Sequence, residues 1–173
     1  MEENKKQFKG NKGGRRERSE KPTFEEKEFD SVILDLARVT RVTKGGKRMR
    51  FRAAVVIGDR KGRVGFGIAK GADVALAVSK STRLAKKSVF KIVFDKSTIP
   101  HWVSAKEKAA KILLKPAPSG SGVIAGGAMR VVLELGGVPD VVGKMLGANN
   151  KVNNARATMK ALKSLKPRLS SKK

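Results

Sequence analysis

Residues 48–71, RMRFRAAVVIGDRKGRVGFGIAKG, decide how the first half of the chain folds. The apolar run that ends at Gly58 is rich in β-branched residues, and residues 59–62 have a typical turn composition. Over residues 64–69, bulky apolar side chains alternate with glycine or alanine. This alternation is the period of a strand with one bulky face and one nearly bare face. The stretch therefore predicts two antiparallel strands joined by a short turn.

The sequence on either side of this pair predicts a third strand and a helix. The run VILDLARVTRV at 32–42 is rich in β-branched residues, and the glycines at 45–46 mark a turn before the next strand. Over residues 72–90, apolar and small side chains recur at helical spacing. Residues 30–95 are therefore expected to form a β-β-β-α module, with a short closing strand at 91–94.

Residues 96–166 predict a second small α/β module, which makes the fold class α+β. Its expected elements are strands at 102–105, 111–115 and 141–146, a helix at 125–135, and a last helix capped by Asn149 or Asn150. Residues 1–29 contain few large apolar groups and are expected to form a disordered basic arm. Residues 167–173 are expected to be a basic tail.

The net charge of the chain points to a polyanionic partner. Lysine and arginine number 40 against 15 aspartate and glutamate residues, which gives a formal net charge of +25. Nucleic acid and an anionic membrane are the two candidates. No apolar run approaches the roughly 18 residues of a spanning helix, and the first ten residues lack the apolar stretch of a signal peptide. A membrane partner is therefore not expected, and the protein is expected to stay in the cytoplasm.

The sequence offers no catalytic constellation, so the chain is not expected to be an enzyme. A nucleotide loop needs glycines at a set spacing, but Gly67 is followed by Gly71 rather than by a glycine three residues on. His101 is the only histidine and cysteine is absent, so neither a metal site nor a cofactor is expected. We interpret His101, which precedes Trp102, as structural.

Basic residues are concentrated over 36–71, where eleven of them stand against one acidic residue, Asp59. They are expected to form one focused patch. Arg48, Arg50 and Arg52 share one strand face by two-residue alternation, while the opposite face is expected to pack on the helix. Like charges repeated on one strand destabilise the free protein, so a compensating anion is expected.

The glycines of the third strand leave one face of that strand without side chains, where another molecule could bind. Gly65 and Gly67 are expected to leave a shallow surface on which a phosphate backbone can approach the chain closely. Arg60, Lys61 and Arg63 are expected to reach that backbone from the rim. Shape and phosphate contact favour a folded RNA over base reading in a major groove.

Four motifs within residues 32–166 give the chain a family resemblance. They are RVTKGGKRMRFRAAVVIGDRKGRVGFGIAKG, TIPH, PAPSGSGVIAGGAMRVVLELGGVPDVVGK and NNKVNNARATMKAL, in this order. The chain resembles the bacterial small-subunit ribosomal protein five family. One departure is Lys151, because the family often has proline in the first turn of the last helix, which leaves the start of that helix open.

The resemblance implies a double-stranded-RNA-binding-like first module and a second α/β module, both bound to the small-subunit rRNA. It implies a structural constituent of the small ribosomal subunit that supports subunit assembly and decoding accuracy. The implied neighbours are ribosomal proteins four and eight and the mRNA entry path, and no self-association is expected.

The patch and the resemblance together assign three groups of residues. The rRNA-binding residues are Arg41, Lys44, Gly45, Gly46, Lys47, Arg48, Arg50, Arg52, Arg60, Lys61, Arg63, Gly65, Gly67 and Lys70. The loop that the resemblance places near the spectinomycin site consists of Thr40, Arg41, Val42, Thr43, Lys44 and Gly45. The implied contact with ribosomal protein four involves Gly120, Gly122 and Arg130.

Two other functions remain open to test. A free-standing regulator that binds double-stranded RNA would need the first module alone, and the second module argues against it. The second alternative is an enzyme that binds ATP through residues 65–71, and the glycine spacing described above argues against it.

Overall fold

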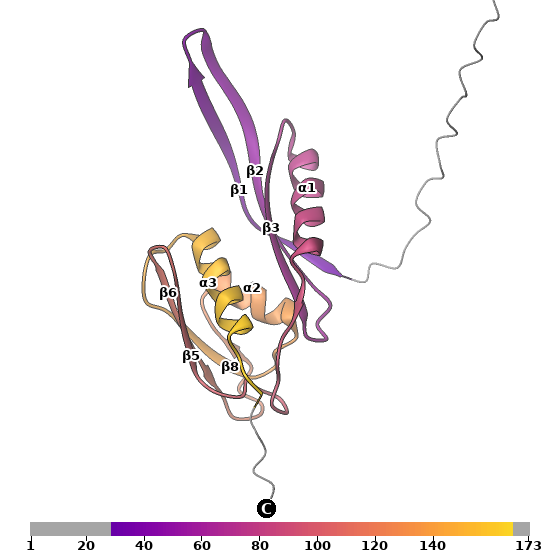
Figure 1. The fold of residues 1–173 in the computed structure, drawn as a ribbon, viewed down its shortest axis with the longest axis vertical. Helices are drawn as coiled ribbons and strands as arrows, with labels where there is room; N and C mark the ends of the chain where they lie inside the picture. The colour runs from indigo at the N-terminus through magenta and orange to yellow at the C-terminus, as the bar shows by residue number, and fades with distance from the viewer. Residues whose placement is uncertain (1–28, 168–173) are drawn as a thin grey trace, which may run out of the picture.

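The computed structural model describes residues 29–167. The arm predicted for residues 1–29 and the tail predicted for 167–173 lie outside this range, apart from residues 29 and 167 themselves. Two four-stranded sheets and three helices make up the described part of the chain, and Figure 1 shows the first sheet above the second. The α+β class expected from the sequence is confirmed.

The first sheet has the predicted β-β-β-α order. Its elements are β1 (Asp30–Thr43), β2 (Gly46–Gly58), β3 (Arg63–Gly71), α1 (Val74–Lys87) and a two-residue β4 (Phe90–Lys91). The strands pair in the order β1-β2-β3-β4, and every pair is antiparallel. The closing strand is therefore shorter and earlier than the 91–94 expected, and α1 is shorter than 72–90 because Asp73 and Ser88 cap it.

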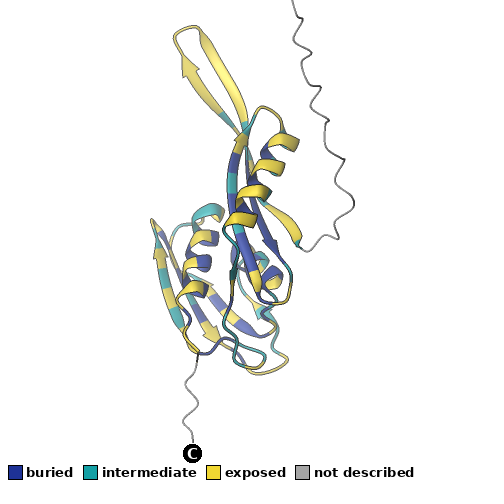
Figure 2. Ribbon diagram, turned by 45° about the vertical axis from the view of Figure 1, so that its right-hand side comes forward, coloured by how far each residue is buried: buried dark blue, intermediate teal, exposed yellow. Residues whose placement is uncertain are grey.

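The β1–β2 hairpin extends beyond the rest of the molecule. Residues 41–50 are all exposed, whereas residues 53–58 of the same β2 strand are all buried. Figures 1 and 2 show the hairpin tip standing clear of α1 and of the second sheet. The tip is thus held by strand pairing alone, without a hydrophobic core beneath it.

The second sheet carries two helices. Its elements are β5 (Val103–Glu107), β6 (Ala110–Pro116), β7 (Val123–Ile124), α2 (Gly127–Gly136), β8 (Val141–Met145) and α3 (Lys151–Lys163). The strand order is β5-β6-β8-β7, with β7 and β8 parallel and the other pairs antiparallel. The two-residue β7 was not predicted, because so short a strand has no recognisable period.

The last helix begins at Lys151, so the missing proline does not disturb its start. The side chain of Asn150 accepts a hydrogen bond from the backbone N–H of Asn153 at 3.2 Å, which caps the helix. Ala155, Met159 and Leu162 are buried and lie on one face of the helix.

The two sheets share one hydrophobic core. Val56 and Val64 of the first sheet belong to the same buried cluster as Leu114 and Leu133 of the second module. The backbone N–H of Arg60 also donates to the carbonyl oxygen of Leu135 at 3.0 Å. The chain passes from the first sheet to the second between β4 and β5, and the two sheets have a common core.

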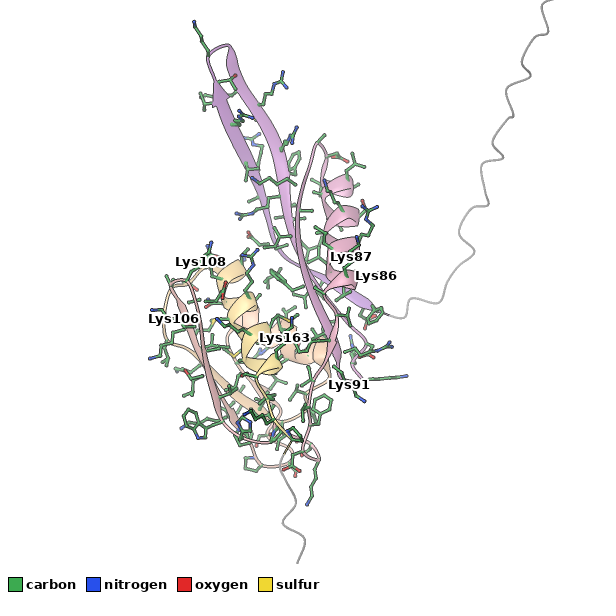
Figure 3. All side chains as sticks on the ribbon, viewed as in Figure 1. Lys86, Lys87, Lys91, Lys106, Lys108 and Lys163 are labelled. Carbon is green, nitrogen blue, oxygen red and sulfur yellow. The ribbon has the colours of Figure 1, made fainter. Side chains whose placement is uncertain are left out.

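Helix α3 and the short strand β4 also meet at this junction. The ammonium nitrogen of Lys163 lies 5.0 Å from the centre of the Phe90 ring, and Figure 3 shows Lys163 on the side of α3 that faces the first module. Contacts of this kind orient the first sheet, and with it the projecting hairpin, on the second module.

Candidate nucleic-acid interface

The face of the hairpin opposite α1 brings like charges together. Arg41 and Arg48 are direct partners across β1 and β2. Arg52 and Lys70 are direct partners across β2 and β3, closer to the body of the sheet. Arg50 lies between these pairs on the same face by alternation. Like charges placed directly opposite each other destabilise a sheet. Nothing in the packing of this face requires them.

These cations line a shallow groove of about 220 Å³, which we call the hairpin groove. It is lined by Val39, Thr40, Arg41, Arg48, Arg50 and Lys70. Within residues 29–167, none of its four cations makes an ion pair. The hairpin groove therefore combines an open surface with uncompensated positive charge, which suits an anionic partner.

Arg52 differs from the other arginines of this face. Its guanidinium donates to the carboxylate of Asp35 at 2.8 Å, and 35% of its side chain is exposed. Arg52 thus lies on the same strand face as Arg48 and Arg50, as expected, but it is paired with an acid of the neighbouring strand. Met49, expected to pack on the helix, is 54% exposed because α1 does not extend as far as the hairpin tip.

The turn at the tip is open on all sides. A Cβ atom added to Gly45 or Gly46 would meet nothing within 4 Å, and Gly46 has φ +141°, which favours glycine. The Thr43 hydroxyl donates to the carbonyl oxygen of Gly46 at 3.0 Å and closes the turn. Lys44 and Lys47 are exposed there, and Val42 of the predicted drug-response loop is 70% exposed. The whole turn is accessible to a large ligand.

The basic turn between β2 and β3 lies at the opposite end of the sheet. β2 is 13 residues long, so at about 3.4 Å per residue this turn is roughly 40 Å from the hairpin tip. Arg60 pairs with Asp30 at 3.0 Å, and Arg63 pairs with Asp59 at 2.6 Å. The single patch expected from the sequence is therefore two separate groups, because strands carry neighbouring residues in sequence far apart in space.

Asp59 organises the β2–β3 turn. Its burial tends to raise the pKa of its carboxyl, but hydrogen bonds from the Arg63 guanidinium and from the backbone N–H groups of Arg63 and Lys61 outweigh this and hold the pKa below the usual value. Arg63 also lies over the ring of Phe29, 4.9 Å from its centre. The two arginines of this turn are thus paired with acids, whereas Lys61 is exposed and has no ion pair in residues 29–167.

The bare glycine face of β3 admits the helix rather than a phosphate backbone. Gly65 and Gly67 are buried, and a Cβ on Gly65 would lie 2.5 Å from the carbonyl oxygen of Ala85. A Cβ on Gly67 would collide with the carbonyl oxygen of Ser81 and lie 2.6 Å from the backbone nitrogen of Ala85. The prediction that these glycines open the sheet to RNA is therefore wrong. The small residues Ala77, Ser81 and Ala85, spaced by four, were the signal that could have revealed this close helix contact.

The loop before β7 is held by a buried acid that sequence reasoning missed. Asp140 is 5% exposed, and its carboxylate accepts the backbone N–H of Gly122 at 2.9 Å. That bond holds the pKa of Asp140 below its usual value, against the effect of burial and with help from Gly120, Ser97 and Ser121. Gly120 has φ +86° and Gly122 φ +70°, conformations that other residues rarely adopt.

Arg130 lies on α2, the helix that follows this loop and β7 in the chain. It is exposed on α2, which contacts β7, and it lines a hollow of about 400 Å³ with Ile124 and Val142. Gly126 packs on Met145, whereas Gly127 has open space around it.

His101 is structural, as interpreted from the sequence. Its Nε2 accepts the backbone N–H of Lys166 at 3.2 Å, so its Nδ1 carries the proton and donates to the carbonyl oxygen of Trp102 at 2.9 Å. The described part of the chain contains no group of three histidine, cysteine or acidic residues that could hold a metal ion. None of the helices in residues 29–167 has the length and apolar character that a bilayer-spanning helix needs.

Comparison with known families matches both halves of the chain. The family described as "Ribosomal protein S5, N-terminal domain" matches residues 29–93, and "Ribosomal protein S5, C-terminal domain" matches residues 105–171. The chain belongs to the ribosomal protein S5 family. The "Small ribosomal subunit protein uS5" of Mycoplasmoides gallisepticum is 51% identical over 138 residues. These residues are 79% of this chain but 61% of that relative, so the chain spans less than two thirds of the curated relative it matches.

Membership of the S5 family confirms the resemblance inferred from the four sequence motifs. The first family match covers the whole β1–β2 hairpin and α1, and the second covers the two helices of the second module. The first match ends at residue 93 and the second begins at residue 105, so residues 94–104 lie between them.

Proposed function

We propose that this protein is a structural constituent of the small ribosomal subunit that binds small-subunit rRNA and performs no catalysis. The observation that carries the proposal is the hairpin groove, in which Arg41 and Arg48 face each other across the strands without any ion pair in residues 29–167. A phosphate backbone placed between such cations would relieve their repulsion and form charge-assisted hydrogen bonds. The ribosome would place the protein in the cytoplasm.

The hairpin suits insertion into a folded RNA. It is long, exposed on both faces over residues 41–50, and tipped by Lys44 and Lys47 around an unobstructed glycine turn. No aromatic side chain lines the hairpin groove, so stacking on bases contributes little there. Recognition would therefore depend on the shape of the RNA and the position of its phosphates.

Salt-dependent binding tests this proposal. Each phosphate contact contributes about 0.7 to 0.9 to the slope of log affinity against log salt concentration, so Arg41→Gln, Arg48→Gln and Arg50→Gln together should reduce the slope for bacterial small-subunit rRNA by about 2 to 3. The control replaces Lys111, Lys115 and Lys144, three exposed cations of the second sheet, by glutamine. An equal reduction in both variants would contradict a role of the hairpin groove.

Sedimentation separates this proposal from a free-standing regulator of double-stranded RNA. The protein should remain with the small subunit through a high-salt wash, because it would be enclosed by RNA on several sides. Complete release into the supernatant, with preserved binding to unrelated duplex RNA, would favour the regulator.

We extend the proposal to three finer points on the basis of the family resemblance. Residues 40–45 would lie near the spectinomycin site, and their exposure in the hairpin tip supports this. Gly120, Gly122 and Arg130 would contact ribosomal protein four, with ribosomal protein eight and the mRNA entry path nearby. Lys44→Glu should change the spectinomycin sensitivity of cells without preventing subunit assembly, and an unchanged sensitivity would remove residues 40–45 from that site.

A further inference from the structure

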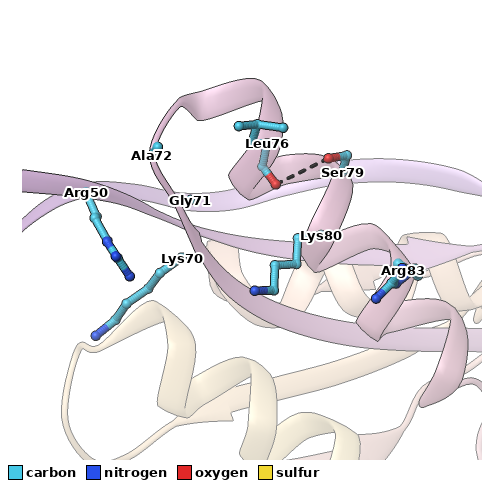
Figure 4. A pocket seen from close by; sticks show the side chains of 8 residues that line it. All are labelled: Arg50, Lys70, Gly71, Ala72, Leu76, Ser79, Lys80 and Arg83. Atoms are coloured by element: carbon cyan, nitrogen blue, oxygen red, sulfur yellow. Dashed lines mark hydrogen bonds between the residues drawn. The ribbon is translucent and has the colours of Figure 1, made fainter.

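A second groove continues from the hairpin groove around the edge of β3. We call it the edge groove. It has a volume of about 610 Å³ and is lined by Arg50, Lys70, Gly71, Ala72, Leu76, Ser79, Lys80 and Arg83. Arg50 and Lys70 line both grooves, so the two surfaces adjoin. Figure 4 shows Lys80 and Arg83 of α1 extending to the same side of the strand as Arg50 and Lys70.

The edge groove contains four cations from two different layers of the fold. Arg50 and Lys70 come from the sheet, and Lys80 and Arg83 come from the helix that covers its other face. Within residues 29–167 none of them makes an ion pair, and no acidic residue lines the groove. Asp73, the closest acid along the chain, caps α1 and is not part of the lining. The four charges thus have no counterion among the residues that the structure describes.

Beside the edge groove, the part of the chain that the structure describes places no strand against the edge of β3 opposite β2 beyond Val64. β4 pairs with only the first two residues of β3, and further along the Ser88 hydroxyl bonds both the N–H and the carbonyl of Phe66 on that edge. In an antiparallel sheet alternate residues turn their polar groups to the same side, so Ile68 and Lys70 present theirs at the open edge. An N–H can donate to a phosphate oxygen, and a carbonyl can accept from a ribose 2′-hydroxyl.

We infer that the edge groove binds the phosphodiester backbone of an RNA strand that continues from the hairpin groove. Lys80 and Arg83 contact its phosphates, and the open edge of β3 contacts its phosphates and sugars. No aromatic residue lines the groove, so the strand is held without base stacking and without sequence preference. This inference rests on the proposed function, because it assigns a second contact region for the same RNA.

Neutralising the two helix cations tests the inference. In the full chain, Lys80→Gln with Arg83→Gln removes two phosphate contacts, so the salt slope for bacterial small-subunit rRNA should fall by about 1.4 to 1.8. The matched control is Lys111→Gln with Lys115→Gln, which makes the same change of charge on β6. All four side chains are exposed, so unfolding is not expected, and circular dichroism checks this. An unchanged slope, or an equal fall in the control, would overturn the inference.

Crosslinking in the assembled subunit gives an independent readout. A photoreactive residue at Ser79, which lines the edge groove and is exposed, should crosslink to rRNA, whereas one at Ser104 on β5 serves as the control position. Crosslinks from Ser79 to protein alone would mean that an acidic protein fills the groove and would overturn the inference. If the three-arginine hairpin variant weakens rRNA binding while the helix variant does not, the proposed function stands and only the edge groove is excluded.

Discussion

The tip of the β1–β2 hairpin and the β3 strand beneath α1 both combine glycine with basic residues, but glycine has a different purpose in each. At the tip, Gly45 and Gly46 have open space where a side chain would be, and the neighbouring lysines are exposed. Under the helix, Gly65 and Gly67 allow two backbones to come into contact. Glycine beside cations therefore indicates a binding surface only where no other element covers it.

The largest effect is expected beneath the helix. Gly67→Val would force side-chain atoms into the backbone of α1 at Ser81 and Ala85, and overpacking of this kind should lower the free energy of unfolding by about 3 kcal/mol or more. Urea denaturation followed by circular dichroism measures it. Gly45→Val is the control at the tip and should change stability by less than about 0.5 kcal/mol. Similar losses in the two variants would break the comparison.

The loop of Gly120 and Gly122 is intermediate between the hairpin tip and the strand beneath α1. Its glycines have open space around them, as at the tip, but hydrogen bonds to Asp140 fix the loop backbone. Asp140→Asn removes the charge that accepts the loop N–H groups and should lower the free energy of unfolding at neutral pH. Because the pKa of Asp140 is lowered in the folded protein, its stabilisation is present above its unfolded pKa of about 3.9 and is lost as pH falls through the folded value. Unfolding curves between pH 2 and 7 should therefore be flatter for the variant than for the natural protein. A parallel pair of curves would show that the charge is unimportant.

A smaller effect is expected where the hairpin meets the body of the sheet. Asp35→Asn leaves the half-buried Arg52 without its ion pair and should cost about 1 kcal/mol, since both side chains are partly screened by water. The freed cation should also raise rRNA affinity slightly at low salt. Titration at two salt concentrations tests this, and weaker binding at low salt would show that Asp35 positions the arginine for RNA.

The smallest effect is expected at the β2–β3 turn. Arg60→Gln should leave the salt slope of rRNA binding unchanged within error, because Arg60 is paired with Asp30 and lies far from the hairpin groove. The same titration as for the hairpin variants measures it. A fall in slope of about 0.7 to 0.9 would show that this turn also contacts a phosphate.

The elements of the fold could be predicted because their signals are local. The period of two in β2 and β3, the period of 3.6 in α1, and the side-chain cap at Asn150 are each set by residues close in sequence. β7 and the full length of the β1–β2 hairpin could not be predicted in the same way. The two-residue β7 forms only because β8 lies beside it. The hairpin strands can extend beyond the hydrophobic core only because β1 and β2 pair with each other along their full length.

The candidate site was predicted in composition but not in arrangement. Four cations without an ion pair in residues 29–167 were all expected, namely Arg41, Arg48, Arg50 and Lys70. In contrast, Arg52 and the arginines of the β2–β3 turn are paired with acids. Lys80 and Arg83 were not among the rRNA-binding residues expected from the sequence. Their approach to Lys70 depends on how α1 crosses β3, which sequence spacing does not encode.

The sequence by itself determined the excess of positive charge, the order of strands and helices, and the presence of one bare strand face, because composition and side-chain period are properties of the chain alone. The tertiary structure decided what covers that face and which cations keep their charge uncompensated. Both depend on contacts between residues distant in the chain: the backbone of α1 at Ser81 and Ala85 occupies the space beside Gly67, and Asp35 reaches Arg52 only across the paired strands.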